Sequence, residues 1–97
     1  MSVIVIVQGN YNPAGSSQLQ EYQTLARPII AKHGGQVVAR GTGLHSLAGQ
    51  RKWQTGIVLR FPFEAAAQAW HNDQEYQKII PLRSSGYSEL EIYVFQE

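Results

Sequence analysis

The 97-residue sequence contains no cysteine and carries little net charge. The absence of cysteine excludes disulfides, thiolate metal sites and thiol catalysis, and it is compatible with the cytoplasm, where we expect the protein to reside. Eight basic residues face seven acidic ones, for a formal net charge of +1, and no basic run is longer than Arg51-Lys52. A nucleic-acid-binding surface needs clustered positive charge, so we expect no nucleic-acid partner.

Long hydrophobic runs are missing as well. The opening segment MSVIVIV has no basic region, its apolar run is too short for a signal peptide, and no cleavage site of small residues follows it. A membrane-spanning helix needs roughly 20 apolar residues, and no segment approaches that length. We therefore interpret residues 3–7 as a strand and expect no membrane partner.

Motifs for cofactors and metals are also lacking. The segment RGTG at residues 40–43 is a lone G-x-G without the third glycine or the following helix that a dinucleotide site requires. His33, His45 and His71 are far apart, and no two of them have the i, i+4 spacing of a helical metal site. We expect neither a cofactor nor a bound metal.

The pattern of apolar residues predicts four strands and two main helices. Residues 3–7 form an unbroken β-branched run, typical of a strand that is covered on both faces. A helix with a 3.6-residue apolar period is expected from Ser17 to the Gly34-Gly35 pair. The expected elements that follow are a strand at 36–41, a connection at 41–52, a strand at 53–61, a helix after Pro62, a short helix capped by Asn72, and a strand at 90–95.

This order of elements is the split β-α-β arrangement. It predicts an α+β fold with a four-stranded antiparallel sheet and both helices on one face, in one domain at residues 1–97. The first and last strands are apolar on both sides, so the face without helices would expose a patch that monomers rarely tolerate. We therefore expect a homodimer formed through this sheet face. The alternative is a long loop that covers the open face.

Three segments carry a resemblance to a known family. They are KHGGQVVARG at 32–41, LRFPFEAAAQAW at 59–70 and NDQEYQKIIPLR at 72–83. Together they resemble the uncharacterised domain-of-unknown-function family 1330, within the dimeric α/β-barrel superfamily. The resemblance implies a ferredoxin-like subunit in a dimeric α/β barrel, but no particular reaction, because that superfamily supports several chemistries.

Tyr76 and Arg83 are the main predicted ligand-binding residues. They share the inner face of the short helix through their i, i+7 spacing, and Arg83 stands where an apolar residue is expected. A guanidinium on an inner face needs a partner, which is either an internal carboxylate or the carboxylate of a ligand. Arg40, near the end of the second strand, and Trp53, at the start of the third, complete this predicted set.

The candidate catalytic residue is His45. It lies in the glycine-bearing connection between the second and third strands, and loops on a rigid scaffold often carry functional groups. Histidine transfers protons near neutral pH, which suits general acid or base catalysis.

Three functions remain open from these residues. The leading one is binding of a small anionic organic molecule in a cleft between sheet and helices, anchored by Arg83 and Tyr76. The second is a cofactor-independent enzyme, monooxygenase-like or isomerase-like, that acts on a small carbonyl or aromatic metabolite through His45. The third is a structural or interaction protein without a ligand, in which the arginines form internal salt bridges.

Overall fold

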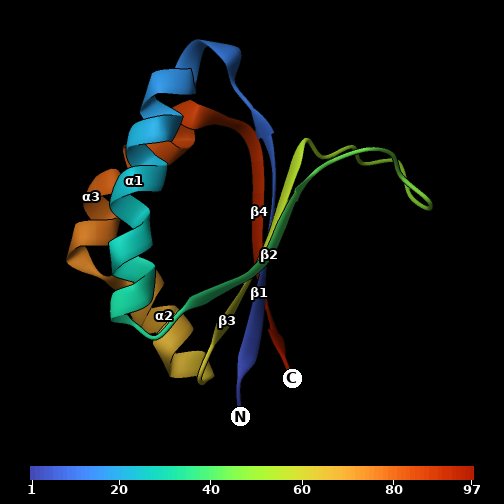
Figure 1. Ribbon diagram of the computed structural model, residues 1–97. Helices are drawn as coiled ribbons and strands as arrows, with labels where there is room; N and C mark the ends of the chain where they lie inside the picture. The colour runs from blue at the N-terminus through green and yellow to red at the C-terminus, as the bar shows by residue number, and fades with distance from the viewer.

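A computed structural model describes all 97 residues, and helices and sheet form two layers (Figure 1). None of the helices combines the length and the apolar character that crossing a membrane requires. In chain order the elements are β1 (Val3–Tyr11), the 3-10 helix η1 (Pro13–Gly15), α1 (Ser16–Lys32), β2 (Gln36–Thr42), β3 (Thr55–Phe61), α2 (Glu64–Asn72), α3 (Gln74–Gly86) and β4 (Tyr87–Gln96).

The four strands form one antiparallel sheet in the order β2-β3-β1-β4. At its centre Val5 of β1 lies between Leu59 of β3 and Val94 of β4. All three helices cover the same face of this sheet (Figure 1). The predicted α+β, ferredoxin-like class is therefore confirmed, with a long α3 where a short helix was expected.

The core lies between the sheet and the helices. The side chains of β1 alternate, so Val3, Val5 and Val7 are buried against the helix layer. From α2, Trp70 stacks on Phe61 of β3 with their ring centroids 5.4 Å apart. This packing leaves the opposite sheet face without helical cover.

We call this uncovered side the open face. It carries apolar residues, as predicted from strands that are apolar on both sides. Ile4 and Ile6 of β1 are only half-buried there, and Tyr93 of β4 remains 67% exposed. Two charges near one end of the sheet neutralise each other, because Arg60 donates to the Glu97 carboxylate from Nε at 2.8 Å and from Nη2 at 3.1 Å. A face with apolar side chains and paired charges is suited to burial.

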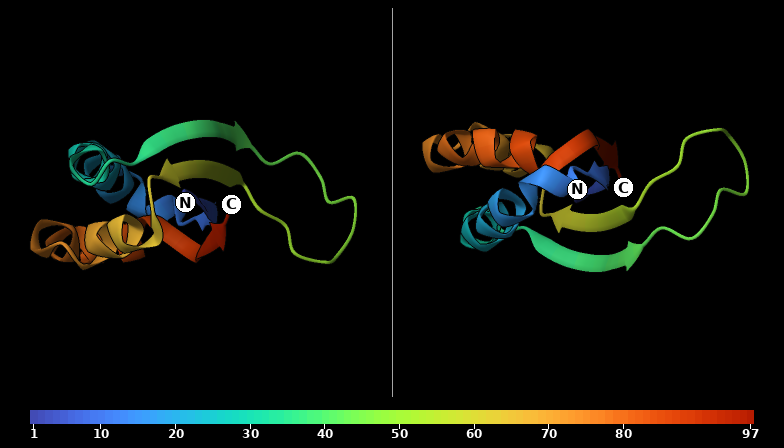
Figure 2. Two further views of the ribbon diagram at one scale, coloured as in Figure 1. Left: turned by 90° about the horizontal axis from the view of Figure 1, so that it is seen from below. Right: turned by 90° about the horizontal axis from the view of Figure 1, so that it is seen from above.

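Residues 43–54, which we call the arm, join β2 to β3. The arm projects beyond the open face, away from the helices (Figures 1 and 2). Its two limbs touch at the base, where the Gly43 amide donates to the Gln54 carbonyl at 2.9 Å. A Cβ at Gly43 would lie 1.6 Å from the Trp53 carbonyl oxygen, so only glycine fits. Trp53, predicted to start the third strand, belongs to the arm instead.

The end of α1 is fixed to the start of α3 through Asp73. Its carboxylate caps α3 by accepting from the Glu75 amide at 2.8 Å, one residue beyond the predicted cap at Asn72. It also binds Lys32 Nζ at 2.9 Å and His33 Nε2 at 2.8 Å. Its side chain is only 6% exposed.

These contacts make the stability of the helix layer depend on pH. The hydrogen bonds from His33 and Lys32 hold the pKa of the Asp73 carboxyl well below its ordinary value of 3.8. A carboxyl with a lowered folded-state pKa stabilises the fold fully above its unfolded-state pKa. That contribution declines as the pH falls below about 4 toward the folded-state value.

Replacing Asp73 with Asn should therefore lower the free energy of unfolding most at neutral pH. Urea denaturation at about pH 7 and about pH 2.5 measures the difference from the wild-type protein, which should shrink in acid. Glu21→Gln, at an exposed position of α1, serves as the control and should show no such difference. An Asp73→Asn deficit of the same size at both pH values would contradict this assignment.

Candidate functional site

A small cleft lies between α1 and the helix-covered face of the sheet, and we call it the α1 cleft. Its volume is about 80 Å³, roughly two to three times the volume that one water molecule occupies in the liquid. Most of its walls are apolar or aromatic, which favours the carbon body of a ligand over water. The lining residues are Val7, Tyr22, Gln23, Ala26, Arg27, Ile30, Val37, Arg40, Ile57, Leu59, Trp70, Tyr87, Leu90 and Ile92.

The only charged residues that line this cleft are two arginines. Arg27 comes from α1, and Arg40 comes from the edge strand β2, where it pairs with Ile57 of β3. Because side chains paired across strands lie on one face, Arg40 shares the helix-covered face with Ile57. Neither guanidinium has a carboxylate partner, and both side chains are exposed. They give the cleft a positive mouth.

A hydrogen-bonded cluster lies beside the cleft, between α1 and α3. Arg83 donates from Nη1 to the hydroxyl of Tyr76 at 3.0 Å, as their shared helix face predicts. The Tyr76 hydroxyl lies 2.6 Å from the hydroxyl of Tyr22, which lines the cleft. Arg83 Nη1 also lies 3.2 Å from His71 Nε2 at the end of α2. Arg83 has no carboxylate within salt-bridge distance.

Burial sets the protonation of this cluster. Burial raises the pKa of the Tyr22 hydroxyl far above its ordinary value of 10.0, and the neighbouring Tyr76 raises it further. Burial also lowers the pKa of His71, and the adjacent Arg83 adds to this effect. Tyr22 therefore stays protonated at neutral pH, and Arg83 carries the positive charge of the cluster.

The indole of Trp70 contributes an unused donor to the same region. Trp70 is only 3% exposed and lines the α1 cleft, and its Nε1 is the one buried side-chain polar atom without a hydrogen-bond partner. Its ring lies next to Tyr76, with centroids 5.0 Å apart. Such an unpaired buried donor costs about 1–3 kcal/mol, so it needs an explanation.

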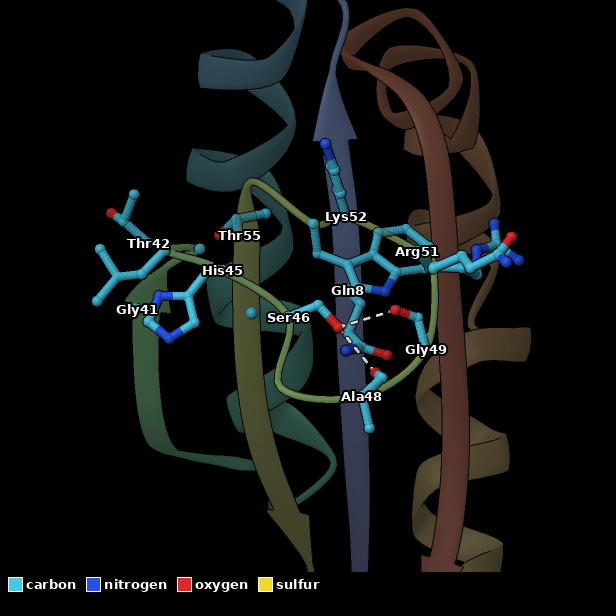
Figure 3. Close-up of a pocket in the computed structure, with 15 residues that line it drawn as sticks. Gln8, Gly41, Thr42, His45, Ser46, Ala48, Gly49, Arg51, Lys52 and Thr55 are labelled. Atoms are coloured by element: carbon cyan, nitrogen blue, oxygen red, sulfur yellow. Dashed lines mark hydrogen bonds between the residues drawn. The ribbon is translucent and has the colours of Figure 1, made fainter.

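His45 and Trp53 lie elsewhere, on the other side of the sheet. Both line a wider hollow between the arm and one end of the open face, which we call the arm hollow, with a volume of about 780 Å³. His45 and Arg51 lie on opposite sides of this hollow (Figure 3). Arg51 attaches the base of the arm to β4 by binding Glu91 at 2.8 Å, and within the arm its guanidinium lies 4.8 Å from the Trp53 ring centre.

The structure thus divides the predicted site residues between two places. Tyr76 and Arg83 form one cluster, and Arg40 lies across the cleft that adjoins it, whereas His45 and Trp53 belong to the arm hollow. No group of three or more His, Asp or Glu side chains is positioned to hold a metal ion.

The predicted set of site residues left out four contributors: Tyr22, Arg27, Trp70 and His71. For two of them a signal was available. Tyr22 and Trp70 lie on apolar helical stripes, and each carries a polar group that needs a partner when buried. The sequence pattern does not distinguish Arg27 and His71 from ordinary surface residues, and only the packing of the helices shows what they contact.

Comparisons with known proteins agree with this fold. A family model described as a domain of unknown function, DUF1330, matches residues 5–96. No curated protein sequence matches the chain. Among solved structures, a protein of unknown function from Rhodopseudomonas palustris is similar with a TM-score of 0.88 and 17% identity, covering 99% of this chain and 82% of that one.

Two more distant structures also share this fold. A ferredoxin-like protein of unknown function from Thermobifida fusca, described as dimeric, has a TM-score of 0.67 and 14% identity, covering 100% of this chain and 92% of that one. The cofactor-independent oxygenase SnoaB from Streptomyces nogalater has a TM-score of 0.69 and 10% identity, covering 99% and 92%. At such low identities these likenesses show the fold alone.

Proposed function

The chain belongs to the DUF1330 family, a family without an assigned function, and from this premise we propose that it binds a small organic acid in the α1 cleft. One observation carries the proposal. The cleft has mostly apolar walls, and its only charged lining residues are Arg27 and Arg40, which have no carboxylate partners. A carboxylate would supply the missing partner through charge-assisted hydrogen bonds.

The size of the cleft limits the ligand. A volume of about 80 Å³ is well below the range of drug-sized pockets, so the buried part of the ligand is a short carbon chain. The charged end stays at the exposed mouth with Arg27 and Arg40, where it keeps part of its hydration. Arg83 and Tyr76 act at the inner end of the cleft, through the hydroxyl of Tyr22.

We further propose that the protein is a homodimer formed through the open face. Tyr93 and Phe95 are exposed there beside the half-buried Ile4 and Ile6, although monomers seldom expose a contiguous apolar patch of this kind. A second copy, packed face to face, buries both patches by the same contacts in each subunit. Structures of the same fold that are described as dimeric support this assembly.

A second candidate function is cofactor-independent catalysis on a small carbonyl or aromatic metabolite. The arm hollow favours it, because its volume of about 780 Å³ lies in the range of small-molecule sites. His45 would transfer the proton and Trp53 would contact the substrate, while a second copy on the open face would close the hollow. The similar fold of SnoaB from Streptomyces nogalater, which is described as a cofactor-independent oxygenase, supports this candidate.

The proposed binding of a carboxylate by Arg27 and Arg40 is tested with the variants Arg40→Gln and Arg27→Gln and with pentanoate as the probe. Each substitution removes one charge-assisted hydrogen bond at an exposed position, so the dissociation constant should rise about tenfold. Isothermal titration calorimetry measures this change. Arg51→Gln, at the base of the arm, is the control and should bind pentanoate like the wild-type protein. Equal affinity of all four proteins would refute the proposed mouth.

The dimer is tested by Tyr93→Arg, which places a positive charge on the open face without disturbing the core. Sedimentation equilibrium should give twice the chain mass of 10.8 kDa for the wild-type protein. The variant should dissociate at least about tenfold more readily, because packing two copies face to face buries the new charges. Leu25→Arg, on the exposed side of α1, should remain dimeric. A wild-type mass of one chain would rule out the assembly.

A further inference from the structure

The direction of the hydrogen bonds in the cluster between α1 and α3 can be deduced from its chemistry. Arginine only donates, so the Tyr76 oxygen accepts the bond from Arg83. Tyr76 is 0% exposed, and the only other partner near its hydroxyl is the Tyr22 oxygen, 2.6 Å away. If Tyr22 donated to Tyr76, the Tyr76 proton would be buried without an acceptor, which is unfavourable.

Arg83 therefore donates to Tyr76, and Tyr76 donates to Tyr22. The Tyr22 oxygen accepts the proton of Tyr76, and the Tyr22 proton is left for an acceptor elsewhere. Because Tyr22 lines the α1 cleft, that acceptor is expected inside the cleft. The positive charge of Arg83, the first donor in this series of hydrogen bonds, polarises the bonds that follow and makes Tyr22 a stronger donor.

Trp70, which lines the same cleft, carries a second unused donor. Its buried Nε1 has no partner, and an indole N–H can only donate. The sheet contributes mostly aliphatic side chains to the inner cleft, from Val7, Ile57, Leu59, Leu90 and Ile92, and Tyr87 of β4 adds one hydroxyl. Two residues of the lining thus carry unused donors, and the other uncharged polar lining side chains, Gln23 and Tyr87, accept a hydrogen bond from neither of them.

From these two unused donors we infer that the ligand is an oxo acid, with a ketone oxygen that accepts from Tyr22 and Trp70 while its carboxylate meets Arg27 and Arg40. This inference rests on the proposed function and narrows its ligand class. A ketone oxygen accepts two hydrogen bonds and brings no proton that would need an acceptor. The corresponding acid without the ketone leaves both donors unpaired.

The test compares matched acids, 4-oxopentanoate with pentanoate and 2-oxobutanoate with butanoate, by calorimetry on the full chain. In at least one pair the oxo acid should bind about tenfold more tightly. Tyr22→Phe should abolish most of this preference, because it removes the donor to the ketone oxygen. Tyr93→Phe, on the open face, is the matched control and should keep the preference.

A second readout needs no substitution at the site. The chain has two tryptophans, so a proton–nitrogen correlation spectrum shows two indole signals, assigned with Trp53→Phe. The Trp70 signal should move downfield with the oxo acid more than with its plain counterpart, while the Trp53 signal in the arm stays in place. This result decides the question even if Tyr22→Phe does not fold.

The outcomes separate the inference from the function on which it rests. Preferential binding of an oxo acid, with the Trp70 shift, supports both. Equal affinity for both members of each pair, with equal Trp70 shifts, overturns the oxo-acid inference and leaves acid binding in the cleft standing. Failure of all four acids to bind overturns the proposed function and the inference with it.

Discussion

The contact between the hydroxyls of Tyr22 and Tyr76 joins the two long helices at the level of the cleft. Without it, the proton of the fully buried Tyr76 hydroxyl would have no acceptor, because the Tyr76 oxygen accepts from Arg83 and has no other partner. The contact gives the buried Tyr76 hydroxyl a partner. It also links the Arg83 guanidinium to Tyr22, and it fixes the position of Tyr22 in the wall of the α1 cleft. The shape and the polarity of the α1 cleft both depend on it.

The second constraint is the one-sided cover of the sheet. Three helices on one face bury Val3, Val5 and Val7, so the alternate residues of the same strand, Ile4 and Ile6, face the other way. The arm projects on that same side, which places the arm hollow where a second copy would pack (Figure 2). The two candidate sites therefore differ in kind: the α1 cleft is complete within one subunit, whereas the arm hollow is open until something covers it.

Much of this fold follows from local patterns in the sequence. Strand alternation, the helical stripes and the order of elements are periodic signals, and they predict the four-stranded sheet with its helices on one face. Boundaries were less accurate, because the strand pairing of β1 with β4 extends both strands to Tyr11 and Tyr87, beyond their apolar runs. Trp53 was misplaced because its alternation with Thr55 continues into the arm, where no strand pairs with it.

The site was harder to predict than the fold, because its residues meet only through tertiary packing. Tyr76 and Arg83 share a helix, so their spacing of seven residues was sufficient to bring them together. The pairing of Tyr22 with Tyr76 spans 54 positions, and it depends on how α1 crosses α3, which no local pattern encodes. The unpaired Nε1 of Trp70 can likewise be recognised only from the structure, which shows that no acceptor lies near the packed ring.

The central claim is that the α1 cleft is the place where a small organic acid binds. A crystal structure of the protein grown with 4-oxopentanoate tests it most directly, because it locates the ligand without assuming a site. The predicted result is a carboxylate at Arg27 and Arg40, with the carbon chain among the apolar walls of the cleft. An empty cleft with the acid bound in the arm hollow beside His45 would contradict the claim and move the site to the other face of the sheet.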